Sequence, residues 1–358
     1  MSSRNVSVSP QKMLLPLAAA QFVCSFAGSN MNVAINSIAK DLGTTIQGVQ
    51  TAITLFLLTM AALMILGSKA TDRFGRKKIL MIGLSIYGTG AVIASLAQGL
   101  GLLIVGYSIF EGVGSALLIP PVYILTTLAF HDMTSRARAF GLISGMGGVG
   151  AAAGPLIGGL ITSAISWRAA FVFQAAVVAT IVLLSRRMID PLEPDPGRAF
   201  DAFGAVLSAV GMFFVVLGIL QADTNGVLTA VFVGVGTAFL AWFFLHIRSC
   251  ERAGKEPLLS TGLFRNRTSN LGLATQNIQW FILIGTSFVV AVFLQTVRGY
   301  DAIETGVIFT AATAGILASS LAAARQARYL ALQRLGKARL HDIDRRRQHH
   351  SNPETYDQ

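Results

Sequence analysis

Charged residues are scarce in this sequence. Asp, Glu, Lys and Arg make up 13% of the 358 residues, whereas a soluble globular protein carries about a quarter. The mean hydropathy is +0.62, and 53% of the residues are hydrophobic. An ordinary soluble enzyme is therefore excluded, and the composition predicts a chain that lies mostly in lipid.

Cysteine is also scarce, and the two that are present, Cys24 in an apolar run and Cys250 in a basic loop, are too few for a disulfide framework. We expect both to be free thiols.

The sequence also lacks a glycine loop for nucleotides, a clustered set of metal ligands and a nucleophile paired with a base. We therefore expect no enzyme activity, no cofactor and no metal.

Apolar runs of about 20 residues, the length that crosses a membrane as a helix, occur repeatedly along the chain. They are continuous and do not alternate between apolar and polar residues, so they predict helices and not barrel strands. The expected fold is therefore an all-α polytopic membrane protein. The ten candidate spans are 13–37, 49–68, 79–98, 101–125, 138–163, 168–186, 202–221, 227–247, 271–297 and 302–323.

The basic residues test this segmentation, because Lys and Arg collect in cytoplasmic loops. Of the 28 Lys and Arg, all but Lys40, Arg168 and Arg298 fall on one side of the ten spans. This asymmetry predicts a multi-pass protein of the cell (inner) membrane with both termini in the cytoplasm. It also accounts for the net charge of +11 without nucleic acid as a partner.

The spacing of the spans predicts the domain organisation. Short loops join the first six spans, and an acidic, proline-bearing segment then separates them from the remainder. The expected parts are a cytoplasmic N-terminus (1–12), a six-helix N-terminal bundle (13–187), a cytoplasmic linker (188–201), two linker helices (202–247), a cytoplasmic loop (248–270), two helices of an incomplete C-terminal bundle (271–323) and a basic polar cytoplasmic tail (324–358).

The loop between the second and third spans packs one acid and five bases around a glycine. Positive charge at a lipid surface would require neither the acid nor the glycine at this spacing. The loop resembles the signature G-x-L-A-D-R-x-G-R-K of the major facilitator superfamily, although a serine replaces its first glycine. The resemblance implies a latch between two halves of a transporter, formed by Asp72, Arg73, Gly75, Arg76 and Lys77.

Glycines recur four residues apart in the fifth span, at Gly150, Gly154 and Gly158. A helix face without side chains lets a neighbouring backbone approach closely, and Pro155 adds a kink. With Gly159, the run G-x-x-x-G-P-x-x-G-G resembles the antiporter signature of drug-exporting facilitators. The alternative is a generic packing face of small residues.

Polar residues form a stripe on one face of the first span, at Gln21, Ser25, Ser29, Asn32 and Asn36. Polar groups at membrane depth are costly unless they face protein or water, so we expect the stripe to line a transport path. The alternative is hydrogen bonding between helices. The segment resembles the first span of fourteen-helix drug/proton antiporters, without their usual acid and proline.

The second half offers its own candidates for the cavity wall, Gln276 and Gln279. Packing between helices is an equal alternative for these side chains.

Glu111 is the only acidic residue that the segmentation places deep in the bilayer, with Ser108 and Ser115 on the same helical face. An ionisable group at that depth is a functional candidate, and burial favours the protonated carboxyl that coupling needs. A protonated structural glutamate is the alternative. The segment resembles the family signature R-x-x-Q-G-x-G through Gly112 and Gly114, but Ser108 replaces the arginine and Glu111 the glutamine. We therefore expect Glu111 to carry the proton.

Together, these resemblances imply a proton-coupled exporter of small amphipathic compounds that works by alternating access in the lipid bilayer. They cover residues 13 to about 340 and imply a fourteen-helix protein that stops four helices early. A chain of this kind would be truncated, and it would need a partner such as a second copy of itself to transport. The alternatives are an inactive or interaction-only membrane remnant, and a facilitator of another small metabolite.

Overall fold

The computed structural model describes residues 10–192, 195, 201–222, 225–255, 257–300, 304, 307–309, 311, 314–315 and 318–319. These residues form helices joined by short turns and include no strand. The expectation of an all-α protein is therefore confirmed over the part of the chain that the structure describes.

The helices follow one another with few intervening residues. In chain order they are α1 (Pro10–Asp41), α2 (Ile46–Phe74), α3 (Arg76–Ser95), α4 (Leu100–Leu103), the π-helix η1 (Ile104–Glu111), α5 (Gly112–Ala129), α6 (Met133–Ala164), α7 (Trp167–Ser185), α8 (Ala202–Leu220), α9 (Gly226–Arg252), the 3₁₀-helix η2 (Thr261–Arg265), α10 (Arg267–Val292) and the π-helix η3 (Phe293–Val297).

Within the described residues, eight helices are long and apolar enough to cross a membrane, and they coincide with the first eight expected spans. The fourth span combines α4, η1 and α5 into one continuous crossing, Leu100–Ala129. The ninth expected span, 271–297, falls on α10 and η3. The tenth, 302–323, lies largely outside the described residues, as does the tail after residue 319.

Most long helices begin at a short polar residue whose side chain accepts a backbone N–H of the first turn. This capping satisfies donors that have no partner inside the helix. The capping residues are Thr45 for α2, Asp132 for α6, Ser166 for α7, Asp201 for α8, Asn225 for α9 and Asn266 for α10. The polar residues of the short loops therefore fix where each apolar span starts.

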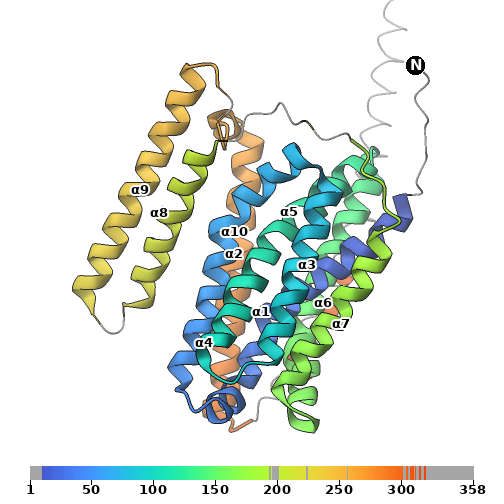
Figure 1. Cartoon of the computed structure of the whole chain (residues 1–358), viewed down its shortest axis with the longest axis vertical. Helices are drawn as coiled ribbons and strands as arrows, with labels where there is room; N and C mark the ends of the chain where they lie inside the picture. The colour runs from blue at the N-terminus through green and yellow to red at the C-terminus, as the bar shows by residue number, and fades with distance from the viewer. Residues whose placement is uncertain are drawn as a thin grey trace, which may run out of the picture.

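Helices α1 to α7 pack around a shared apolar core, in which Leu17, Phe56, Leu80 and Phe171 are almost fully buried. Helices α8 and α9 pack against each other as a hairpin at the edge of the molecule, with α8 beside α2 (Figure 1). A second, smaller apolar cluster, which includes Phe243 and Leu258, attaches this hairpin to α2. The hairpin thus has its own attachment outside the bundle formed by α1 to α7.

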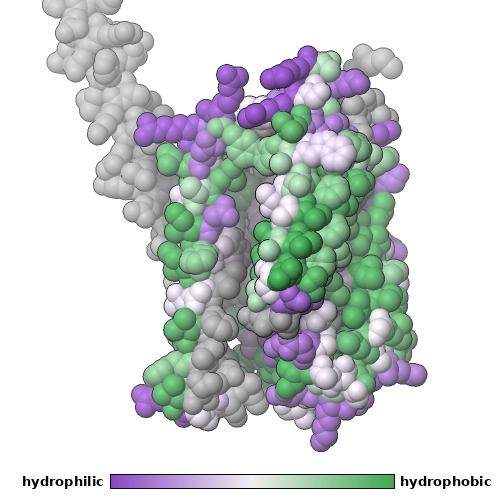
Figure 2. Space-filling view, turned by 90° about the vertical axis from the view of Figure 1, so that its left-hand side faces the viewer, coloured by the Kyte–Doolittle hydropathy of each residue, from purple (hydrophilic) through white to green (hydrophobic). Residues whose placement is uncertain are grey.

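Figure 2 shows the side of the molecule on which α8 and α9 lie. Hydrophobic residues cover most of the middle of this face, and hydrophilic residues gather mainly at its two ends. This distribution suits a protein with lipid around its middle. We call the upper end in Figure 1, where α2 passes into α3 through Arg73 and Arg76, the basic end.

The opposite end is fastened by one acidic residue at the end of α1. Asp41 accepts hydrogen bonds from Trp167 Nε1 at 3.0 Å and from the Arg168 guanidinium, which also donates to the Ala97 carbonyl at 2.7 Å. The guanidinium lies over the Trp167 ring, 4.3 Å from its centroid. The end of α1, the start of α7 and the turn after α3 are therefore joined by charged and aromatic contacts.

Candidate functional site

The loop between α2 and α3 is a sharp turn with glycine at its centre. Gly75 has a φ of 96°, a conformation that other residues rarely adopt, and its N–H bonds to the Thr71 carbonyl at 3.1 Å. The turn brings Arg76 Nη2 to 3.3 Å from Asp72 Oδ1. Only 8% of the Arg76 side chain is exposed, against 24% for Asp72, so this ion pair is largely shielded from water.

The same loop is held by the segment that follows α7. Asp190 Oδ2 accepts the backbone N–H groups of Arg76 at 2.7 Å and Lys77 at 3.1 Å, and thereby caps the start of α3. Lys77 Nζ donates to the Arg186 carbonyl at 2.9 Å. The Asp195 N–H reaches the Asp72 carbonyl at 3.4 Å. The loop is thus fastened to the segment 186–195.

Asp190 is a residue that the sequence analysis missed. Its only signal was a position in the acidic segment between the two predicted parts of the chain. Arg73, which was grouped with the latch residues, lies with its guanidinium carbon 5.5 Å from the centroid of the Phe74 ring. The ion pair observed in this loop therefore joins Asp72 with Arg76.

The glycine face of α6 lies directly against α1. A Cβ atom added to Gly150 would collide with the Phe22 carbonyl oxygen, and one added to Gly154 would collide with Ser29 Oγ. A Cβ at Gly159 would meet Val33 Cγ1 at 3.3 Å, which is a milder contact. The glycines therefore serve close approach of two helix backbones.

The polar residues of the α1 stripe fall into two groups, of which only one borders α6. Gln21, Ser25 and Ser29 are half-buried and border α6; Gly147 lies beside Gln21 and Ser25, and Ser29 Oγ is 3.5 Å from the Gly150 carbonyl. Toward the opposite end of the molecule, Asn32 and Asn36 are exposed. Two motifs that are far apart in the sequence, the α1 stripe and the α6 glycines, therefore share one interface.

Asn30 is a second residue that the stripe did not predict. It is 1% exposed, and its Oδ1 lies so close to Gly158 that no side chain would fit there. This oxygen has no hydrogen-bond partner in the described structure. An unpaired buried amide oxygen is costly, so Asn30 is a candidate for a contact that forms in another state of the protein.

Glu111 lies in the interior of the bundle, on the last residue of η1, and is fully buried. Neither carboxyl oxygen makes a well-formed hydrogen bond in the described structure, although the Tyr87 hydroxyl lies within reach of the carboxyl group. Its electrostatic neighbours are Cys24 of α1, Tyr87 of α3 and Tyr107 of η1. A charged carboxylate without a well-formed hydrogen bond is very costly there, so the neutral acid is the form that fits this position.

Two polar side chains near Glu111, those of Tyr87 and Ser108, donate hydrogen bonds to other groups. The Tyr87 hydroxyl donates to Gln174 Oε1 at 2.6 Å. Ser108, which was expected to accompany Glu111, donates instead to the Ala52 carbonyl of α2 at 2.7 Å. Ser115 lies beside the Cys24 thiol. The structure therefore places Glu111 in a buried cluster, separate from the α1 stripe that borders α6.

Gln276 and Gln279 lie on α10 and are exposed. All side chains of α10 that the structure describes are exposed or half-buried. The two residues are not brought together with Glu111 or with the α1 stripe in the described part of the chain.

Comparisons with known proteins agree on one family. The profile of the Major Facilitator Superfamily matches residues 17–339. Puromycin resistance protein pur8 of Streptomyces alboniger is 30% identical over 317 residues, which are 87% of this chain and 62% of that protein. Tetracenomycin C resistance and export protein of Streptomyces glaucescens is 28% identical over 306 residues, which are 83% of this chain and 55% of that protein.

A solved structure supports the same fold. The crystal structure of peptide transporter POT in complex with sulfate matches with a TM-score of 0.51 and 19% identity, over 66% of this chain and 53% of that chain. This likeness concerns the fold alone. The chain spans less than two thirds of the length of the two resistance proteins.

Proposed function

The chain belongs to the major facilitator superfamily, and from this premise we propose that it is a transporter, not an enzyme, that exports small amphipathic compounds in exchange for protons. The observation that carries the proposal is its similarity, over most of its length, to proteins named for antibiotic resistance and export. The helices that would cross the membrane supply the scaffold. Alternating access is the mechanism that the proposal includes.

In this proposal the basic end faces the cytoplasm, as the distribution of Lys and Arg favours. The Asp72–Arg76 pair and the Asp190 cap then form a cytoplasmic latch that holds α2, α3 and the segment after α7 together. Alternating access requires contacts that hold one state and release in another. Because the pair is largely shielded from water, breaking it would let solvent reach both charges.

The interface of α1 and α6 is the second working part of the proposal. Backbones that touch without side chains between them can slide with little change in packed volume. Half-buried Gln21, Ser25 and Ser29 border this contact, so a movement of α6 relative to α1 would expose them to a substrate path. The substrate class stays that of small amphipathic compounds, because the polar groups are few and uncharged.

Glu111 carries the proton in this proposal. Its support is the complete burial of the carboxyl group, neither oxygen of which makes a well-formed hydrogen bond in the described structure. Loading and release require water to reach the carboxyl in one of the two states. Movement of α1 would open the route, because Cys24 of α1 is among the electrostatic neighbours of the carboxyl.

The described side chains of α10, including Gln276 and Gln279, present a surface that is largely exposed. We propose a second copy of the chain as the partner for this surface if the chain transports as it stands. Cross-linking through a cysteine placed at Gln279, in a background that lacks Cys24 and Cys250, tests this. Absence of a cross-linked dimer in membranes that show efflux would contradict the dimer.

The experiment for the function is efflux of a fluorescent cationic dye from cells that lack their own exporters. We expect faster efflux from cells that express the chain than from empty cells. Equal efflux with dyes, puromycin and other amphipathic compounds would contradict export and would favour an inactive remnant or a carrier of another metabolite.

The experiment for the proton uses Glu111→Gln, which keeps the shape of the side chain without the exchangeable proton. The variant should insert normally and lose the dependence of efflux on the pH gradient. Asp132→Asn is the matched control, because Asp132 is an exposed acid outside the spans. Unchanged coupling in Glu111→Gln would remove Glu111 from the mechanism.

A further inference from the structure

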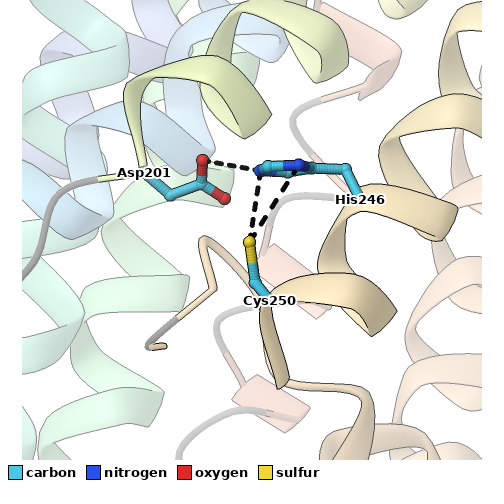
Figure 3. A group of neighbouring side chains, drawn as sticks. All are labelled: Asp201, His246 and Cys250. Carbon is cyan, nitrogen blue, oxygen red and sulfur yellow. Dashed lines mark hydrogen bonds and ion pairs between the residues drawn. The ribbon is translucent and has the colours of Figure 1, made fainter. Parts of the chain in front are cut away.

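Three potential metal ligands meet where α8 begins and α9 ends. Asp201 immediately precedes α8, and His246 and Cys250 lie one turn apart near the end of α9 (Figure 3). Asp201 Oδ1 is 2.9 Å from His246 Nε2, and Cys250 Sγ is 3.4 Å from the same nitrogen. The three ligand atoms all lie within 4.8 Å of one another.

The positions of the three side chains distinguish a relay that activates a thiol from a metal site. A relay that activates a thiol needs the cysteine on one imidazole nitrogen and the carboxylate on the other. Here both approach Nε2, and Nδ1 is farther from the sulfur, at 4.0 Å. Sulfur, nitrogen and oxygen therefore converge on one region of space, which is the arrangement of ligands around a cation.

The donor set selects the kind of cation. Thiolate, imidazole and carboxylate together suit zinc and similar transition-metal ions, which bind these atoms at about 2.0–2.3 Å. Zinc sites in other proteins use two ligands that lie four residues apart on one helix face. Water can take a fourth position, because 21% of the His246 side chain and 9% of the Asp201 side chain are exposed.

Asp201 also has a structural task. Its Oδ1 accepts the Gly204 N–H at 2.8 Å and caps α8, and its Oδ2 accepts the Leu258 N–H at 3.2 Å. Burial works against ionisation, but these two bonds and the contact with His246 hold the pKa of the carboxyl below its usual value. The cap orients the carboxylate as outer partners orient metal ligands. It gives no reason for a thiol beside the imidazole.

We propose that Asp201, His246 and Cys250 bind a zinc-like divalent transition-metal ion at the basic end of the α8–α9 hairpin. The metal replaces the Cys250 S–H proton, which passes to water, and binds the neutral imidazole through Nε2. It joins the start of α8 to the end of α9. The sequence alone does not predict this site, because Asp201 lies 45 positions from His246 in the chain.

The test uses the full chain, purified without a histidine tag in detergent, and Co²⁺ as the probe. His341, His349 and His350 lie outside the described residues and are changed to Ala in every sample, so that the tail binds no metal. Co²⁺ should bind with a sulfur-to-metal charge-transfer band, and Zn²⁺ should displace it. Absence of this band at saturating Co²⁺ would overturn the proposal.

Two matched pairs of variants assign the ligands. Cys250→Ser should remove the band, whereas Cys24→Ser, which changes the other thiol, should keep it. His246→Ala should abolish binding, whereas His131→Ala, at an exposed histidine, should not. A band that persists in Cys250→Ser, or one that Cys24→Ser removes, would contradict the site.

Asp201→Asn tests metal binding by this side chain separately from its role as the cap of α8. Asparagine caps helices as well as aspartate does, so the α8 start should be retained. Affinity for Zn²⁺ should fall by roughly tenfold or more, since even outer partners of a metal site contribute that much. Zn²⁺ should also raise the melting temperature of the parent protein and not that of Cys250→Ser. Equal affinity and equal stabilisation in parent and variants would overturn the proposal.

Discussion

Asp190 Oδ2 accepts the backbone N–H of Arg76 at 2.7 Å, across 114 positions of sequence. The contact caps α3 with a carboxylate from the segment after α7. It therefore ties the loop between α2 and α3 to the segment that follows α7. The same carboxylate oxygen also receives Lys77 N–H, so a single side chain satisfies two donors that α3 leaves without internal partners.

Removal of this cap should destabilise the basic end. Asp190→Ala should lower the free energy of unfolding by about 1–2 kcal/mol, the usual cost of losing a cap. Asp190→Asn should cost much less, because the amide oxygen still accepts an N–H. Thermal unfolding in detergent measures both variants. Identical melting temperatures for Ala and Asn would contradict the capping role.

Substitution of the α6 glycines should reveal how closely α1 approaches. Gly150→Ala forces a methyl group against the Phe22 carbonyl oxygen, so the backbones must separate. We expect a loss of about 1–3 kcal/mol in unfolding free energy, typical of overpacking. Gly159→Ala is the control, because its nearest contact is a side-chain methyl of Val33 at 3.3 Å. Equal melting temperatures for the two variants would refute the close contact.

The two buried tyrosines near Glu111 should differ in their contribution. Tyr87→Phe leaves Gln174 Oε1 without its 2.6 Å donor in a buried site, at a cost of about 1–3 kcal/mol. Tyr107→Phe loses a longer bond, 3.2 Å, to the Ala27 carbonyl and should cost about 0.5–1.5 kcal/mol. Chemical or thermal unfolding of the two variants compares them. A larger loss for Tyr107→Phe would contradict this ranking.

The cap of α6 should make stability depend on pH. The Ser135 backbone N–H, 2.9 Å from Asp132 Oδ2, and the Ser135 hydroxyl lower the pKa of the Asp132 carboxyl. The ionised cap therefore stabilises the folded state above the ordinary aspartate pKa, and this stability is lost as pH falls through the lowered value. The melting temperature of the parent should exceed that of Asp132→Ala at neutral pH, and the difference should shrink in acid. A difference that grows in acid would contradict the assignment.

The spans could be predicted from sequence because length and hydropathy are local properties. The first eight fall on helices, and the conformation at Gly75 follows from a glycine in a tight loop. The family signatures likewise depend on short spacings. In each case the residues that determine the local structure lie close together in the sequence.

The site contacts could not be predicted in the same way, because they join residues far apart in the chain. Nothing near Asp190 indicates that it caps α3, and nothing in the α1 stripe indicates that half of it borders the α6 glycines. Ser108 was expected beside Glu111 from the α-helical period. The π-helix η1 changes that period, and the Ser108 hydroxyl bonds to α2 instead.

The π-helix η1 also affects how this chain is compared with other sequences. A π-helical turn holds about one residue more than an α-helical turn, so it takes up an inserted residue without moving either end of the span. Two transporters can therefore differ by one residue within this crossing and still enter and leave the bilayer at the same places. In an alignment of two such proteins, residue numbers before Ile104 differ by one constant value, and those after Glu111 differ by another. An ungapped alignment of this span with a span of that kind would pair Glu111 with a neighbouring position.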